Sequence, residues 1–172
     1  MPQTRKRVSK KTRSKTTIRA RHAQGEPVFE RADLERIVAD LACTIAPADV
    51  ATLMEHEREL RERVATLDRR FGLLRRQLTL LLDCLHDHLA GRIDQIPYST
   101  IAHAAAAVLY FGNEFDLLPD FLPHIGRLDD AAIVAIACER VAEGLRRYAR
   151  ATGRSWRGVL PVAPAGDVAR PC

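Results

Sequence analysis

The most regular hydrophobic pattern lies in the middle of the chain and predicts a long helix. Large apolar residues recur at alternating spacings of four and three from Leu60 to Leu85, which is a heptad rhythm. The members of this seam are Leu60, Val64, Leu67, Phe71, Leu74, Leu78, Leu81 and Leu85. We expect one helix from Pro47 or Asp49 to about residue 90, ended by Gly91. Such a helix either pairs with a second chain through the Leu60–Leu85 seam or supports the later helices.

Three further segments have helical periodicity, so the predicted fold class is all-α. The first covers residues 31–46 and ends before Pro47. The second, residues 99–113, is small and apolar nearly all round, which indicates burial in protein or shallow insertion in lipid. The third starts at Asp129 or Asp130 and continues to about residue 152, before Gly153. Its predicted inward residues are Ile133, Val134, Ala137, Val141, Leu145 and Tyr148, and its predicted outward residues are Glu139, Arg140, Glu143, Arg146 and Arg147.

The last two helices are joined by a segment rich in aspartate, proline and large apolar residues. The prolines Pro119 and Pro123 forbid a continuous helix through it. Its many apolar side chains indicate that the loop packs into the core, with short carboxylates satisfying its backbone groups. We therefore expect an antiparallel helical hairpin joined by a buried loop that is rich in proline and aspartate.

This segment resembles the signature of the bacterial YkvA family. Tyr110 ends one helix, the run DLLPDFLP covers residues 116–123, Gly126 lies in the following turn, and Asp129-Asp130 opens the next helix. With the flanking helices the resemblance covers residues 99–150. It implies a helical hairpin and, for many relatives, association with a membrane, but no established reaction. The structural loop residues that it points to are Tyr110, Pro119, Pro123 and Gly126.

The basic residues are concentrated at the N-terminus. Residues 1–25 contain nine lysines and arginines and no acid, in a chain whose net charge is +5. The segment has no aromatic residue and no periodicity, so we expect it to be disordered. It can attract anionic lipid or nucleic acid, or have no dedicated partner. The candidate anion-binding residues are Arg5, Lys6, Arg7, Lys10, Lys11, Arg13 and Lys15.

These patterns predict four regions. Residues 1–27 are the basic tail, residues 28–97 contain the long heptad helix, residues 98–153 form the YkvA-like helical domain, and residues 154–172 form a loose C-terminal tail. For Trp156, in that last region, docking on the domain and a position at a lipid interface both stay open.

Four aspartates of the loop are the best candidates for a metal site. Carboxylate oxygens suit Mg²⁺, Ca²⁺ or Mn²⁺, and His103 and His124 are available as further ligands. The competing interpretation, which we favour, is that these carboxylates cap helices and turns. The four candidates are Asp116, Asp120, Asp129 and Asp130.

Two other groups of reactive residues have a structural interpretation. The cluster His86-Asp87-His88, with Asp83, is predicted to be a solvated helix face, because no two of its histidines have the i,i+4 spacing for a shared metal. The four cysteines form no CxxC pair, which indicates reduced thiols in an intracellular protein. Of these, Cys84 and Cys138 occupy apolar positions, so they are expected to be buried and inert.

The sequence as a whole favours a non-enzymatic helical module without a cofactor. No secretory signal is expected, because no apolar run follows the basic N-terminus. We predict a cytoplasmic protein that associates with an anionic membrane surface or a protein partner, and that forms a homo-oligomer. The alternatives are an enzyme that uses a divalent metal bound by the loop aspartates, and non-specific nucleic-acid binding through the tail.

Overall fold

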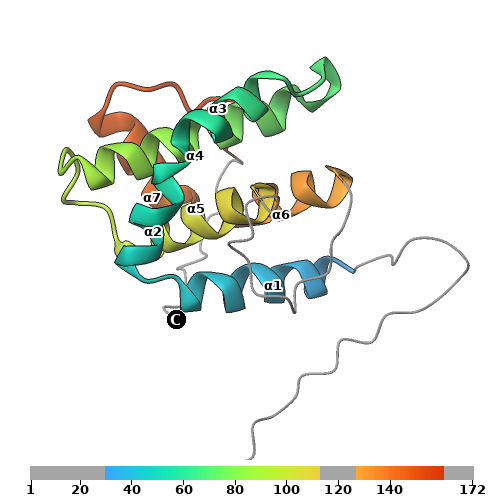
Figure 1. The fold of residues 1–172 in the computed structure, drawn as a ribbon, viewed down its shortest axis with the longest axis horizontal. Helices are drawn as coiled ribbons and strands as arrows, with labels where there is room; N and C mark the ends of the chain where they lie inside the picture. The colour runs from blue at the N-terminus through green and yellow to red at the C-terminus, as the bar shows by residue number, and fades with distance from the viewer. Residues whose placement is uncertain (1–29, 113–126, 161–172) are drawn as a thin grey trace, which may run out of the picture.

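The computed structural model describes residues 30–112 and 127–160, and this part of the chain is helical (Figure 1). It contains no strand, so the predicted all-α class is confirmed. The elements are α1 (Arg31–Thr44), α2 (Pro47–Glu55), α3 (Glu57–Ala65), the short 3-10 helix η1 (Arg69–Phe71), α4 (Gly72–Leu89), α5 (Tyr98–Phe111), α6 (Arg127–Arg140) and α7 (Ala142–Ala151).

Helix α5 lies at the centre of the fold. Every residue from Thr100 to Phe111 is buried, and α1, α4 and α6 all pack against this helix (Figure 1). Four consecutive alanines, Ala104 to Ala107, let the neighbouring backbones come close. Of the two surroundings that the sequence left open for this helix, the structure therefore shows burial in protein.

The prediction of one long helix from Pro47 or Asp49 to about residue 90 is wrong. The chain leaves helical geometry at His56 and again between Ala65 and Arg69, which gives α2, α3, η1 and α4 instead. At the second break, the Thr66 hydroxyl donates to the Arg63 carbonyl, and the Asp68 carboxylate accepts the Arg70 amide at 3.0 Å. These short polar side chains replace helical hydrogen bonds with local ones, so the chain turns there.

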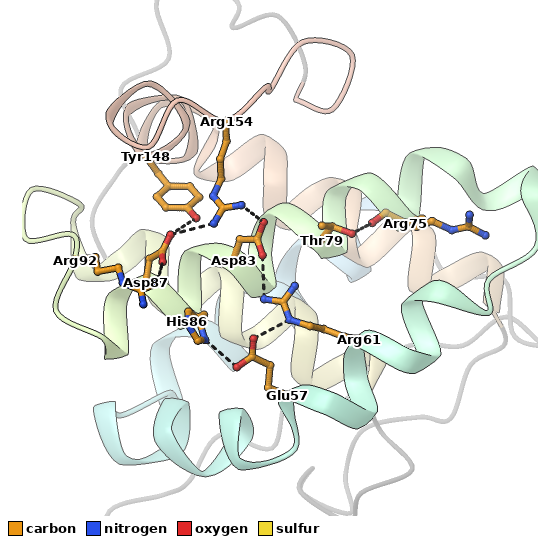
Figure 2. Close-up of polar contacts among 10 residues, drawn as sticks. All are labelled: Glu57, Arg61, Arg75, Thr79, Asp83, His86, Asp87, Arg92, Tyr148 and Arg154. Atoms are coloured by element: carbon orange, nitrogen blue, oxygen red, sulfur yellow. Dashed lines mark hydrogen bonds and ion pairs between the residues drawn. The ribbon is translucent and has the colours of Figure 1, made fainter.

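The turn at residues 66–71 folds the predicted seam back on itself as a hairpin. Glu57 of α3 contacts His86 near the end of α4, and Arg61 contacts Asp83, so the two helices are antiparallel (Figure 2). All seam residues except Phe71 are buried in the chain's own core, and Phe71 is partly buried against it. The seam thus supports the later helices, and pairing with a second copy through it would require the core to open. Oligomerisation itself stays a prediction.

The last predicted helix bends at Val141, where the backbone has φ −113° and ψ 22°, and becomes α6 and α7. All six residues predicted to face inward are buried, which confirms that face. Arg146 is the exception on the outward face: it is 4% exposed, and its guanidinium lies 5.3 Å from the centre of the Trp156 ring. The prediction that Arg146 faces water is therefore wrong, because the C-terminal segment covers it.

The segment after α7 packs against the domain, where the sequence predicts a loose tail from residue 154. Gly153, with a φ of +70°, turns the chain back after the helix. Val159 and Leu160 are buried, and the Gln77 side-chain amide donates to the Val159 carbonyl at 3.2 Å. Trp156 is partly buried against the same core, so docking on the domain is its observed position. Residues 161–172 lie outside the described part of the chain.

Within residues 30–112 and 127–160, no single helix has the length and apolar character needed to cross a membrane. The pair α1 and α2, which is bent by 101°, meets that test on length and composition alone.

The close approach of α7 to Thr100 at Gly144 predicts a specific loss of stability. A Cβ atom added at Gly144 of α7 would overlap Oγ1 of Thr100 and lie 2.9 Å from its Cγ2. Thr100 is a β-branched residue on the central helix and has little freedom to move. We expect Gly144→Ala to lower the free energy of unfolding by about 1–3 kcal/mol in urea denaturation.

Gly72→Ala is the matched control for this experiment. Gly72 has helical dihedral angles, and a Cβ there would meet only the end of the Arg76 side chain at 3.7 Å. Alanine favours the helix, so the control is expected to be neutral or up to about 1 kcal/mol more stable. Equal loss from both substitutions would contradict close packing at Gly144 as the cause.

Candidate functional site

The most concentrated group of polar contacts lies on one face of α4. Asp83 and Asp87 project from this helix toward side chains of α3, α7 and the segment after α7 (Figure 2). One helical turn separates the two carboxylates, so both point to the same side of α4. Arg154 donates to both of them, at 2.5 Å to Asp83 and 3.4 Å to Asp87.

Asp87 is a buried carboxylate with three donors. The Tyr148 hydroxyl donates to its Oδ2 at 2.8 Å, Arg92 donates to its Oδ1 at 2.8 Å, and Arg154 contacts Oδ2. Burial alone would raise the pKa of Asp87, but these hydrogen bonds outweigh it and hold the pKa below its ordinary value. The carboxylate is therefore ionised at neutral pH although it is only 4% exposed.

A chain of alternating charges continues from Asp83 across the hairpin. Arg61 contacts Asp83 at 2.9 Å and Glu57 at 2.7 Å, and the Glu57 carboxylate accepts from His86 at 2.9 Å. Burial acts to raise the pKa of Glu57, but His86 and Arg61 outweigh it, and the pKa is lowered. The contacts tie α3 to α4 along the same side that holds Arg154.

The paired arrangement of this cluster indicates a structural role. Each carboxylate of Glu57, Asp83 and Asp87 already has at least two partners among arginine, imidazole and hydroxyl groups. Burial and the contact with Asp87 raise the pKa of the Tyr148 hydroxyl, so it stays protonated and acts as a donor. Ionised carboxylates held by arginines are poor proton donors and acceptors near neutral pH. The cluster joins α3, α4, α7 and the segments that follow α4 and α7, and each of these carboxylates has its hydrogen-bond partners within the chain.

The prediction of a solvated face around residues 83–88 is wrong for Asp87, which is buried, and for Asp83, which is only 15% exposed in its side chain. His86 binds Glu57, and the His88 ring lies 6.5 Å from the Tyr98 ring. A signal was present in the sequence. Leu80 and Leu82 lie beside the seam and are buried as well, so α4 is covered on more than one face.

The structure does not test the predicted metal site. Asp116, Asp120 and His124 lie outside the described residues, and Asp129 is described only as part of the α6 backbone. Asp130 is partly buried in the first turn of α6. Among the side chains that the structure describes, no group of three or more histidines, cysteines and acids is placed to hold a metal ion. The loop aspartates as metal ligands therefore stay a prediction.

The remaining predicted residues are divided between the core and the undescribed segments. Tyr110 is buried at the end of α5, whereas Pro119, Pro123, Gly126 and all the candidate anion-binding residues of the tail lie outside the described part. His103 is also buried, its Nδ1 donates to the Ser99 carbonyl at 2.8 Å, and burial lowers its pKa. This histidine is neutral and points along its own helix.

Two of the four cysteines are confirmed as core residues. Cys84 and Cys138 are fully buried, and burial raises the pKa of each thiol to about 12. They carry no thiolate at neutral pH, which agrees with the inert role predicted for them. Cys43 is exposed, and Cys172 lies beyond the described residues.

Comparison with known proteins finds one similarity. A family model described as a protein of unknown function (DUF1232) matches residues 100–136, which cover most of α5, the undescribed segment after it and much of α6. Comparisons with curated proteins and with solved structures give no match. Over this stretch the chain is similar to a domain of unknown function, and the match assigns no chemistry to any residue.

The contacts of Asp87 predict how much stability is lost when the Tyr148 hydroxyl is removed. Tyr148→Phe deletes a hydrogen bond to a buried charge, so we expect the free energy of unfolding at pH 7 to fall by about 1.5–3 kcal/mol. The hydrogen bond favours the ionised form of Asp87 and lowers its pKa. The stability that it contributes is therefore present above the unfolded-state pKa, near 4, and is lost as the pH falls through the folded-state pKa.

Urea denaturation of wild type and Tyr148→Phe across pH 2–7 measures this contribution. The difference in free energy of unfolding between the two proteins should become smaller as the pH is lowered. The control is Tyr98→Phe, because the Tyr98 hydroxyl donates to the Ile45 carbonyl at 3.1 Å from a residue that is 39% exposed. We expect the control to cost less than about 1 kcal/mol, with no such pH dependence. A difference between wild type and Tyr148→Phe that stays constant with pH would contradict the role of Tyr148 in ionising Asp87.

Proposed function

We propose that this chain is a non-catalytic helical module, carrying a YkvA-like domain around residues 99–150, that associates with an anionic membrane surface. Attraction comes from the basic N-terminal segment, and the helical part provides a stable body. The similarity of residues 100–136 to a domain of unknown function is consistent with the YkvA-like interpretation.

The separation of charge along the chain is the observation that carries this proposal. Nine of the 27 lysines and arginines lie in residues 1–25, where there is no acid, whereas all 22 acids lie in the rest of the chain. A segment of this kind gains about 1 kcal/mol for each basic residue near an anionic membrane surface. The acids begin at Glu26, so the N-terminal segment is the longest stretch of the chain with basic residues and no acid.

The polar cluster on α4 supports the non-catalytic part of the proposal. Its three carboxylates are paired with Arg61, Arg92 and Arg154, and these pairs hold helices together. These carboxylates stabilise the packing of the helices, and buried Tyr148 does the same through its hydrogen bond to Asp87.

Nucleic acid is the competing anionic partner for the basic segment. That segment contains no phenylalanine, tyrosine or tryptophan, and aromatic stacking is a main source of affinity for single strands. Lipid is therefore favoured, and nucleic-acid binding is an outcome that the experiment can detect.

Vesicle flotation of the full chain tests the proposal. We expect binding to phosphatidylcholine vesicles that contain phosphatidylserine, little binding to phosphatidylcholine alone, and loss of binding between 0.1 M and 1 M salt, where the Debye length falls from about 10 Å to about 3 Å. Replacing Lys6, Lys10, Lys11 and Lys15 together by glutamine should weaken binding by up to about a thousandfold, given about 1 kcal/mol for each charge.

The matched control removes four exposed positive charges elsewhere, by replacing Arg36, Arg58, Arg140 and Arg150 with glutamine. It should float like the wild type. Failure of the wild-type chain to float with anionic vesicles would refute the proposal. Binding to a poly(U) strand in its place would assign the basic segment to nucleic acid.

A further inference from the structure

The turn between α3 and α4 contains a short motif of charged and apolar residues. Most of its side chains take no part in the packing of one helix against another. Its sequence from residue 69 to residue 76 is RRFGLLRR, with two arginines at each end and apolar residues between them. Residues 66–76 contain a single acid, Asp68. Basic residues are thus concentrated at one point of the folded part as well as in the N-terminal segment.

The apolar residues at this turn are partly outside the core. Leu73 lies in the first turn of α4 and is 48% exposed, which makes it the most exposed large apolar residue that the structure describes. Phe71, at the end of η1, is only partly buried, and the Arg70 guanidinium lies 4.9 Å from the centre of its ring. Next to them Leu74 is buried, so the turn is anchored in the core while Leu73 points away from it.

Three of the four arginines are available to an external anion. Arg69, Arg70 and Arg76 are exposed, and among the described residues Arg69 and Arg76 form no ion pair. Arg70 lies 4.0 Å from Asp68, at the limit of an ion pair, and both side chains are more than half exposed. Arg75 differs, because it is half-buried and donates to the Leu67 carbonyl, which fixes the turn.

We propose that this turn, residues 66–76, is a contact site for an anionic membrane surface on the folded domain. The proposal rests on the membrane association proposed above and adds a second point of attachment. Guanidinium groups bind lipid phosphates through paired hydrogen bonds, and an exposed leucine between them enters the boundary between head groups and acyl chains. Leu73, with Arg69 before it and Arg76 after it in the chain, provides this combination on one turn.

The same turn is less suited to nucleic acid. Phosphate contacts would use the arginines, but they would leave Leu73 against water or a polar backbone, and the face of Phe71 is covered by Arg70. An anionic lipid surface satisfies the charges and the apolar side chain together. An anionic lipid surface is therefore the partner that can bind both the arginines and the exposed leucine.

Flotation of full-length variants with phosphatidylserine-containing vesicles tests the site. We expect Arg69→Gln with Arg76→Gln to weaken binding by about 30-fold, and Leu73→Gln by about tenfold. The matched controls are Arg36→Gln with Arg150→Gln, and Leu89→Gln, since Leu89 is an exposed leucine of similar accessibility at the other end of α4. All substituted side chains are exposed, so circular dichroism should show unchanged helix content.

A fluorescent probe at Leu73 gives a second measurement that does not depend on affinity. Trp156 is the single tryptophan of the chain, so Leu73→Trp in a Trp156→Phe background places one reporter at the turn. Adding anionic vesicles should shift its emission to shorter wavelength. An unchanged emission from protein that has bound the vesicles would overturn the proposal.

The outcomes separate this site from the basic segment. If the turn variants bind like wild type while the Lys6, Lys10, Lys11 and Lys15 variant loses binding, the turn is excluded and the proposed function stands. If wild type binds no anionic vesicles, both fail. If the turn variants lose binding to poly(U) and no variant binds vesicles, the arginines serve nucleic acid and this proposal is overturned.

Discussion

The complete burial of α5 is the constraint on which the other helices depend. Its twelve residues from Thr100 to Phe111 are all covered, so the fold must supply partners on every side of one helix. Helices α1, α4 and α6 do so, and Gly144 allows α7 to approach Thr100 where any larger residue would collide. Because α5 is built mainly from small side chains, the large ones come from its neighbours, and α4 therefore has leucines on more than one face.

The polar cluster follows from that arrangement. Once α4 is covered on two sides, Asp87 is buried, and a buried carboxylate requires donors. Tyr148 supplies one from α7, and Arg92 and Arg154 supply others from the segments that follow α4 and α7. The cost of burying the charge is offset by these contacts, and they fix where the segment directly after α7 lies. The best-organised ionisable groups of the described residues thus hold the helices in place, and the features suited to a partner lie at the surface.

Two basic features remain outside this structural role. One is the N-terminal segment, whose charge is evident from the sequence, and the other is the turn at residues 66–76, where arginines flank an exposed leucine. The family match covers neither of them, because it is confined to residues 100–136. The matched stretch includes most of the buried helix α5, so the similarity lies in the helical core. The proposed membrane contacts lie in segments outside the match.

The sequence by itself determined the helical class, the inward residues of the last two helices, and the ends at Gly91 and Gly153, because periodicity and glycine dihedral preferences act locally. The tertiary structure decided what covers each apolar face. A heptad seam has the same spacing in a long paired helix and in a folded hairpin, so the turn at Thr66–Asp68, the burial of Asp87 and the covering of Arg146 could not be predicted from it. The turn is made by local hydrogen bonds of Thr66 and Asp68, but the seam spacing carries no sign of them. The burial of Asp87 and the covering of Arg146 depend on segments after α6 that meet α4 and α7 only in the packed core.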